Sequence, residues 1–192
     1  MLTRPQLEQI GFATLGEDIQ ISPLARFYGA ERIHLGSHVR IDDFCILSAG
    51  EAGIEIGSFI HIAAYCSLIG QEKISMRDFS GLSSRVSIYS SSDDYSGASL
   101  TNPTVPEKYK SVTHAPVVIG RHVIVGAGSV ILPGAELCEG SAIGALSLVT
   151  KNCDPFWIYA GYPAKKIKKR DDKLLLLEKA FRNESIETIR TK

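Results

Sequence analysis

The sequence has no long hydrophobic run and no excess of charge of either sign. Its 192 residues include 21 lysines and arginines against 21 aspartates and glutamates. This balance gives no overall basic field that would attract nucleic acid or an acidic membrane. No apolar run approaches the roughly 18 residues that a membrane span needs, and polar residues interrupt residues 1–16, unlike a secretory signal. We therefore expect a soluble, cytoplasmic protein without nucleic-acid or membrane partners.

The sequence is also poor in cysteine, and its cysteines are scattered. Cys45, Cys66, Cys138 and Cys153 form no Cys-x-x-Cys pair and have no histidine in zinc-ligand spacing. Free cysteine is among the most frequently buried residue types, so we expect four buried thiols. No metal is expected.

What the sequence does contain is a repeat with a period of six. Aliphatic residues recur without a slip at Ile119, Val125, Ile131, Leu137, Ile143 and Val149. A helix has a 3.6-residue stripe and a half-buried strand alternates, so neither explains six steps of six. A coil of short strands does explain them.

The same register continues upstream, where inserted residues lengthen each coil to about twenty. The matching positions are Leu15, Ile21, Phe27 and Ile33; Leu35, Ile41 and Leu47; Ile56, Ile62 and Leu68; and Met76, Leu82 and Ile88. The pattern predicts an all-β solenoid, a triangular prism of short parallel strands whose aliphatic residues point inward and stack on the next coil. The N-terminal segment and a C-terminal helix are expected to cap its open ends.

The repeat stops between residues 89 and 116, where Ser, Asp, Asn, Gly and Pro dominate. A loop of this length is uncommon unless it is functional or disordered, and its aromatic, proline and charged residues favour an ordered, functional arm. Beyond residue 170, Asp171 or Asp172 is a plausible N-cap for a helix of about three turns over LLLLEKAF. We expect residues 1–170 to form the solenoid domain with its extruded loop, and residues 171–192 to form a helix and tail.

Four motifs in fixed order carry a family resemblance: PVVIG, VGAGSVILPG, GALSLVTK and AGYPAKKI. On these motifs the chain resembles the hexapeptide-repeat acetyltransferases, and the resemblance covers about residues 15–170. The nearest likeness is to sugar O- and N-acyltransferases related to galactoside acetyltransferase and to those of surface-polysaccharide biosynthesis. The resemblance implies a left-handed parallel β-helix, a homotrimer, and acetyl-CoA or another acyl-CoA bound in the groove between two neighbours. The period itself does not determine the handedness.

The resemblance also implies a set of coenzyme A contacts. Gly126 and Ala127 match residues that line the pantetheine; Ala145, Thr150 and Lys151 match residues near the pantetheine amides and the nucleotide; Lys165 and Lys168 match basic residues that reach the phosphates. A thin pantetheine arm needs a groove floored by small residues, and phosphates need a local cationic cluster. From the residues alone, the small residues could equally mark tight corners, and the lysines a solvated turn.

The acceptor site departs from the galactoside-type pattern, in which a histidine stands where the coil gives way to the loop. Here that place holds Asp93, Asp94 and Tyr95. For a hydroxyl acceptor, Asp94 or Asp93 would act as the base, with Ser84 and Tyr95 orienting the acceptor, provided that a partly dry site raises the carboxyl pKa. An amine acceptor needs only positioning and a polarised thioester.

We favour the amine, and so predict acyl transfer from acyl-CoA to a nucleotide-linked amino sugar in surface-polysaccharide biosynthesis, because family members that N-acylate such sugars resemble this pattern. O-acetylation of a sugar hydroxyl is the alternative. The two aspartates could also do no more than cap turns.

Among the five histidines, His114 at the end of the loop is the best candidate for a base. Lys108 and Tyr109 are candidates for contacting the sugar or its diphosphate. His34, His38 and His122 are expected at ordinary surface or inter-coil positions, whereas His61 is a candidate for facing the subunit groove. A metal-using or non-catalytic trimer is the rival interpretation, with His61 and His114 as two ligands and no evident third.

Overall fold

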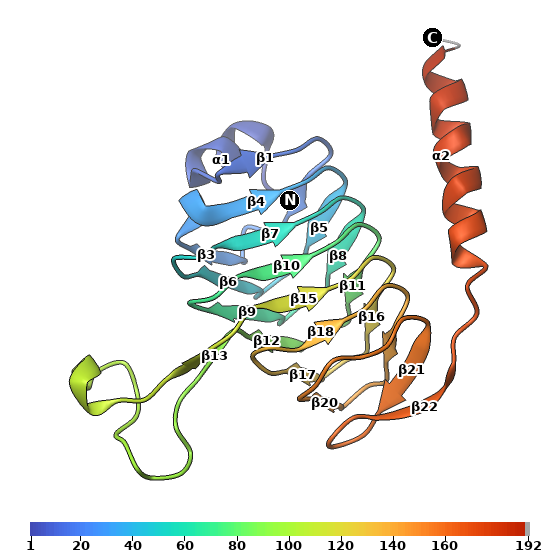
Figure 1. Ribbon diagram of the computed structural model, residues 1–192. Coiled ribbons are helices and arrows are strands. Elements are labelled where there is room, and N and C mark those ends of the chain that lie inside the picture. Colours follow the sequence, from blue (N-terminus) through green and yellow to red (C-terminus); the bar gives the residue numbers. More distant parts are fainter. Residues whose placement is uncertain (191–192) are drawn as a thin grey trace.

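The computed structural model describes residues 1–190. Most of them form a stack of coils with three flat sides, and the strands of successive coils pair in parallel on each side (Figure 1). Sheet A contains β1 (Thr14–Leu15), β4 (Ile33–Leu35), β7 (Ile54–Ile56), β10 (Ile74–Met76), β15 (Val117–Ile119) and β18 (Glu136–Leu137). Sheet B contains β2 (Gln20–Ile21), β5 (Val39–Ile41), β8 (Ile60–Ile62), β11 (Gly81–Leu82), β16 (Ile124–Val125), β19 (Ala142–Ile143), β21 (Trp157–Ala160) and β22 (Lys165–Lys169). Sheet C contains β3 (Arg26–Tyr28), β6 (Ile46–Ala49), β9 (Ser67–Gly70), β12 (Ser87–Tyr89), β17 (Val130–Ile131) and β20 (Leu148–Val149).

The predicted repeat is confirmed, because equivalent residues of successive coils pair directly. Ile62 lies opposite Leu82, and Leu82 lies opposite Val125. The six aliphatic residues from Ile119 to Val149 are at most 3% exposed, so they form one continuous core inside the prism. In Figure 1 the strands of sheet A run from left to right in front and the chain then passes behind as the stack descends, which is the left-handed sense.

Both ends of the stack are covered. Helix α1 (Arg4–Ile10) begins at Thr3, which forms a reciprocal capping box with Gln6, and buries Leu7 against the first coil. The sequence predicted a cap there but not a helix. At the other end β21 and β22 form an antiparallel hairpin that extends sheet B, a ribbon that the hexad pattern did not indicate. The division of the chain at residue 170 stays a prediction.

The corner between sheets A and B carries a ladder of stacked rings, here called the corner ladder. His38, Phe59, Phe79 and His122 stack in that order, with ring centroids 4.6, 4.7 and 5.2 Å apart. All four adopt a left-handed backbone, with φ between 57° and 60°, because the same tight turn recurs in each coil. Their rings therefore project from equivalent points of successive coils.

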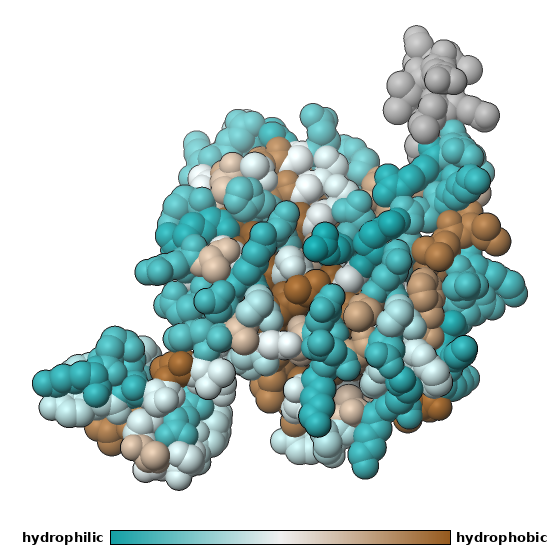
Figure 2. Space-filling model, viewed as in Figure 1, coloured by the Kyte–Doolittle hydropathy of each residue, from teal (hydrophilic) through white to brown (hydrophobic). Residues whose placement is uncertain are grey.

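The C-terminal helix α2 (Leu174–Arg190) docks on the corner ladder at the side of the stack, so the prediction that it caps an open end is wrong, and it is longer than the expected three turns. The ring of Phe181 meets Phe59 and Phe79 edge-on, at 5.3 and 6.1 Å. His122 Nε2 lies 2.7 Å from Glu178 Oε2, and both side chains are only 8% exposed. His122 is thus buried beneath α2 and is no ordinary surface residue. Figure 2 shows apolar side chains on α2, where Leu176 and Leu177 are 71% and 69% exposed.

Glu178→Gln is expected to loosen α2 from the corner ladder. Burial alone would raise the pKa of the Glu178 carboxyl, but hydrogen bonds from Arg182 and His122, with Arg121 nearby, hold that pKa below its ordinary value. A lowered folded-state pKa means that the stabilisation is complete above the ordinary glutamate pKa and is lost as pH falls through the lowered value. We expect a loss of about 1–3 kcal/mol at neutral pH, measured by chemical denaturation with proteolysis of α2 as a local probe.

Glu8→Gln is the matched control for this prediction. Glu8 forms an ion pair with Arg4, but both side chains are at least half exposed, so its loss should cost less than about 1 kcal/mol. Equal effects of the two substitutions would contradict the docking role of Glu178.

Candidate functional site

The predicted extruded loop leaves the solenoid between β12 and β15. Its base is a short antiparallel ribbon of β13 (Ser91–Ser92) and β14 (Thr113–His114), and η2 (Glu107–Tyr109) lies near its tip. Figure 1 shows the loop reaching away from the stack, and Figure 2 shows it as a largely hydrophilic knob. The loop is therefore an ordered arm with its own hydrogen bonds, as the composition indicated.

Asp94 is held inside this arm by three hydrogen bonds. Its carboxylate accepts from the Ser96 hydroxyl at 3.0 Å, the Ser96 backbone N–H at 2.8 Å and the Ser99 hydroxyl at 2.8 Å. These bonds favour the charged form and lower the pKa of Asp94 to about 2. The raised pKa that a carboxylate base requires is not met in this chain, so Asp94 is a fixed anion at neutral pH. The neighbouring Tyr95 is 93% exposed.

A cleft of about 970 Å³ lies between the arm and the coils before it. It is lined by Ser48, Glu51, Ala52, Ile69, Gly70, Gln71, Glu72, Ser91, Asp93, Asn102, Pro103, Glu107, Lys110, Val112 and His114. The structure thus brings the predicted Asp93 and His114 to one cleft. Lys108 and Tyr109 are not among the lining residues; the Lys108 ammonium lies 4.8 Å from the ring of Tyr109.

Two lining residues were missed by the sequence analysis. The Lys110 side chain is only 7% exposed and forms a 2.6 Å ion pair with Glu107. Ser91 Oγ accepts a hydrogen bond from the Gln71 N–H at 2.9 Å and lies 2.8 Å from His114 Nδ1. Ser91 therefore fixes the histidine ring at the mouth of the cleft. The sequence EKYK does not indicate which of its two lysines, Lys108 or Lys110, is buried.

Three of the predicted coenzyme A residues, Gly126, Ala127 and Ala145, lie at the corner between sheets B and C. The register places Ala64, Ser84, Ala127 and Ala145 at equivalent positions of successive coils, and the name small-residue corner is used for these four. The Ser84 carbonyl accepts from the Gly128 N–H at 3.0 Å, and the Ala127 carbonyl from the Leu146 N–H at 2.9 Å. Ser84 thus stands one coil before Ala127, in line with it.

Gly126 allows the coils at this corner to approach closely. A Cβ on Gly126 would lie 2.4 Å from the Ala145 backbone nitrogen, which no real side chain tolerates. Ala127 and Ala145 are exposed beside it. The corner therefore offers a narrow floor of small groups, the shape that a pantetheine arm needs.

A small hollow of about 230 Å³ with a basic rim lies at the end of β20, in the last coil. The predicted Thr150, Lys151 and Lys165 all line it, so residues from β22 and from the last coil meet there. Lys168 lies opposite Ile158 in the β21–β22 ribbon and does not line the hollow, although all of β22 is exposed. Lys166 is already paired with Asp154 and lies 4.4 Å from the Trp157 ring.

Ser84 also lines a separate hollow of about 330 Å³ on sheet B, together with His61, Ala63, Gly81, Leu82, Ser83 and Ile124. His61 Nε2 lies 2.7 Å from Asp42 Oδ2, and Arg40 Nε lies 2.7 Å from Asp42 Oδ1. Of the described residues, none lines both this hollow and the cleft below the arm. The predicted site is thus divided between two surfaces of one chain.

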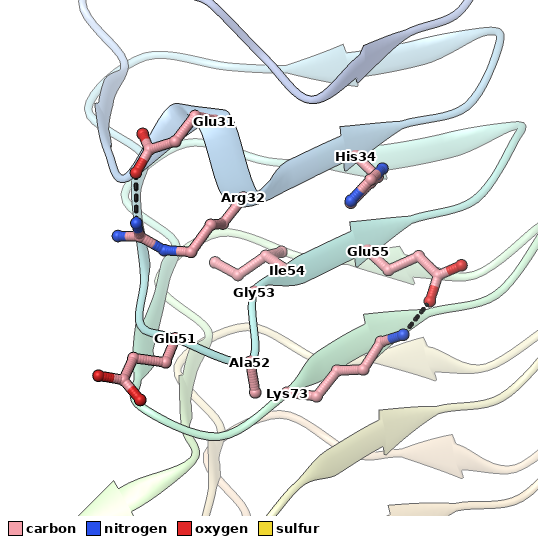
Figure 3. Close-up of a pocket in the computed structure, with 9 residues that line it drawn as sticks. All are labelled: Glu31, Arg32, His34, Glu51, Ala52, Gly53, Ile54, Glu55 and Lys73. Carbon is pink, nitrogen blue, oxygen red and sulfur yellow. Dashed lines mark hydrogen bonds and ion pairs between the residues drawn. The ribbon is translucent and has the colours of Figure 1, made fainter.

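Another hollow, on sheet A, is drawn in Figure 3. Its cations are already engaged: Arg32 pairs with Glu31, and Lys73 lies 2.6 Å from Glu55. Among the side chains that the structure describes, those of residues 1–184, we find no group of three His, Cys, Asp or Glu that could hold a metal ion. In the same part of the chain, no helix is both long and apolar enough to cross a membrane.

Comparison with protein families and curated proteins agrees with this geometry. Residues 116–151 match the family model described as bacterial transferase hexapeptide (six repeats). Over 181 residues the chain is 50% identical to the dTDP-4-amino-4,6-dideoxy-D-glucose acyltransferase of Escherichia coli, and the match covers 94% of both chains.

Solved structures give the same result. AntD, an N-acyltransferase from Bacillus cereus in complex with dTDP and 3-hydroxybutyryl-CoA, superposes with a TM-score of 0.93 at 43% identity, covering 96% of this chain and 97% of AntD. AntD has also been solved with substitutions at its own Ser84 and Asp94. A maltose O-acetyltransferase from Clostridium difficile 630, at 23% identity and a TM-score of 0.58, covering 88% of this chain and 75% of its own, shares the fold.

Proposed function

This chain belongs to the hexapeptide-repeat acyltransferases, and from that premise we propose that it transfers an acyl group from acyl-CoA to the amino group of a nucleotide-linked sugar. The observation that carries the choice of acceptor is Asp94, which three hydrogen bonds keep ionised. An anion with a pKa of about 2 suits the binding of a cationic ammonium and is too weak a base to activate a hydroxyl. The 50% identical relative, a dTDP-amino-sugar acyltransferase, supports the same acceptor.

The donor side of the proposal rests on the small-residue corner. The narrow floor at Gly126, Ala127 and Ala145 fits a pantetheine arm, because Ala127 and Ala145 are small and exposed and the coils approach closely at Gly126. Thr150, Lys151 and Lys165 around the basic hollow, with Lys168 on the same exposed strand, would hold the nucleotide and phosphates. When bound, acyl-CoA supplies the thioester. Ser84, in line with the corner, would orient the reacting groups.

On the acceptor side the arm and its cleft would bind the sugar nucleotide. Asp94 would hold the amine, and Asp93 and His114 would contact the sugar from the cleft wall. Tyr95, Lys108 and Tyr109 lie on the exposed side of the arm, where a neighbouring chain or the nucleotide could meet them. Asp94 and Ser84 have the same types and numbers as the residues substituted in AntD, which supports their choice.

A homotrimer is proposed because the two halves of the site lie on different surfaces of one chain. The Ser84 hollow and the cleft below the arm have no lining residue in common among the described residues. Packing the arm of one copy against the small-residue corner of the next would complete the site. Light scattering at assay concentration should give three times the 20.9 kDa chain mass. The cytoplasmic location and a role in surface-polysaccharide biosynthesis stay predictions.

The function is tested by thiol release from acetyl-CoA and 3-hydroxybutyryl-CoA against a panel of acceptors. We expect turnover with dTDP-linked amino sugars and at least about a hundredfold lower kcat/KM with the matching hydroxy sugars, because an unpaired Asp94 gains nothing from a neutral hydroxyl. Mass spectrometry should show the acyl group as an amide. Turnover of simple glycosides alone would contradict the proposal and favour O-acylation.

A further inference from the structure

The proposed function leaves one proton without an acceptor. A sugar amine is largely an ammonium ion at neutral pH, and it must lose a proton before its lone pair can attack a thioester. Asp94 can hold this ammonium, but a carboxylate with a pKa of about 2 does not remove the proton effectively. The following inference therefore rests on the proposed function and identifies the group that takes that proton.

The Asp42–His61 pair has the geometry of an oriented base. His61 lies in β8 and Asp42 directly follows β5, so consecutive coils bring the two side chains together. The two Asp42 oxygens are both used: Oδ2 lies 2.7 Å from His61 Nε2, and Oδ1 accepts from Arg40 Nε at 2.7 Å. Because an ionised carboxylate only accepts hydrogen bonds, Nε2 carries the ring hydrogen. Nδ1 is then the nitrogen with the free lone pair.

The surroundings leave this histidine open to a ligand. Its side chain is 51% exposed and lines the hollow that Ser84 also lines. Opposite His61 on the next strand stands Gly81, where an added Cβ would meet only the His61 carbonyl oxygen, at an ordinary 3.6 Å. The backbone therefore does not require a glycine there. The missing side chain keeps open the space beside the His61 ring.

Ser84 links this hollow to the donor groove. It occupies the small-residue corner one coil before Ala127, so the hollow and the proposed pantetheine path meet at Ser84. His61 itself stands in strand register with Gly81 and Ile124, which places it beside the end of that path. A thioester at the Ser84 end of the corner would lie next to the ring.

We propose that His61, oriented by Asp42, is a catalytic residue that takes the first proton from the acceptor ammonium beside Ser84. The freed amine lone pair forms the C–N bond at the thioester carbonyl carbon, and the C–S bond breaks with its electron pair leaving on sulfur. The nitrogen gives up a second proton, which ends on the sulfur as the free thiol. His61 returns the first proton to solvent, so one ammonium and one thioester yield one amide, one thiol and one H⁺.

Charged groups reach His61 from one side only among the described neighbours. Strand β5 and the turn after it contribute Asp42 and Arg40, whereas Gly81, Ser83 and Ser84 on the next coil and Ile124 beyond it are uncharged. Burial alone would raise the pKa of the Asp42 carboxyl, but hydrogen bonds from His61 and Arg40 hold that pKa below its ordinary value. Asp42 is therefore the one anion that orients the ring.

The test compares His61→Ala and Asp42→Asn with the wild-type enzyme on a dTDP-linked amino sugar. His34→Ala is the matched control, since His34 occupies an outward position of sheet A and bonds Thr14. We expect His61→Ala to lower kcat/KM by about a hundredfold, with part of the rate restored by added imidazole. Asp42→Asn should lower kcat with little change in KM, because the ring loses the carboxylate that orients it, and His34→Ala should stay within twofold of wild type.

Three results would overturn the assignment while leaving the proposed function intact: less than a threefold loss of kcat/KM in His61→Ala, no rescue by imidazole, or a rise in KM at unchanged kcat. His61 is half exposed, so the variant should fold, and circular dichroism with an unchanged Tm verifies this. Failure of the wild-type enzyme to acylate any amino sugar would instead defeat the proposed function itself.

Discussion

Replacing Ala145 with tryptophan is expected to abolish coenzyme A binding and acyl transfer while the β-helix stays folded. Ala145 is exposed on the small-residue corner, and its backbone lies close to Gly126 of the preceding coil. An indole at this position would therefore fill the groove without entering the core. For the wild-type enzyme, coenzyme A at a hundred times its Kd should add about 2.7 kcal/mol of stability. The variant should show no such gain in a thermal shift experiment.

Ala145→Ser provides the size control at the same position. Serine adds a single oxygen, so coenzyme A should still raise the Tm, and thiol release should stay within about tenfold of wild type. Circular dichroism and light scattering establish whether the tryptophan variant keeps its fold and assembly. Normal coenzyme A binding by a folded Ala145→Trp enzyme would place the donor elsewhere and remove the basis for the small-residue corner as its site.

Asp94→Asn is expected to lower kcat/KM for the amino sugar by at least about tenfold. An asparagine keeps the shape: its carbonyl oxygen can accept from the Ser96 backbone N–H, and its NH2 group can donate to the Ser96 and Ser99 hydroxyls, so the arm should keep its conformation. It carries no charge, and the loss of a charged partner for an ammonium costs about 2–3 kcal/mol. Because the pKa of Asp94 is about 2, its own titration should leave no limb in the wild-type pH–rate profile between pH 5 and pH 9.

The control for the lost charge is Asp18→Asn. Asp18 lies in the first coil and pairs with His38 at 3.2 Å, so its replacement removes one negative charge without touching the arm. Steady-state kinetics should give near wild-type values for this variant. A fully active Asp94→Asn enzyme would show that the amine binds without this carboxylate.

The coils were predictable from sequence because one interaction is repeated many times. Inward aliphatic residues such as Ile119 and Val149 recur at a fixed step, and the structure places them all in the core. Elements that occur once have no such signal. Helix α2 owes its position to Phe181 against Phe59 and Phe79, residues more than a hundred positions away, and no local pattern indicates that contact.

The candidate site was predicted in part for the same reason. Thr150, Lys151 and Lys165 do gather around one hollow, as the family motifs implied. Lys110 was missed because the loop has no period, and its burial depends on the folded path of the arm. The Asp42–His61 pair could have been found: residues one coil apart in sequence become neighbours in space, and 19 positions separate these two.

Helix α2 should also affect how cooperatively the protein unfolds. In a plain solenoid each coil touches only the next, so stability adds up from nearest neighbours and the ends can fray independently. Here Phe181 packs on Phe59 and Phe79, and Glu178 pairs with His122, so one helix contacts several coils at once. The middle of the stack should then unfold in one sharp, cooperative thermal transition, and deleting α2 should broaden that transition.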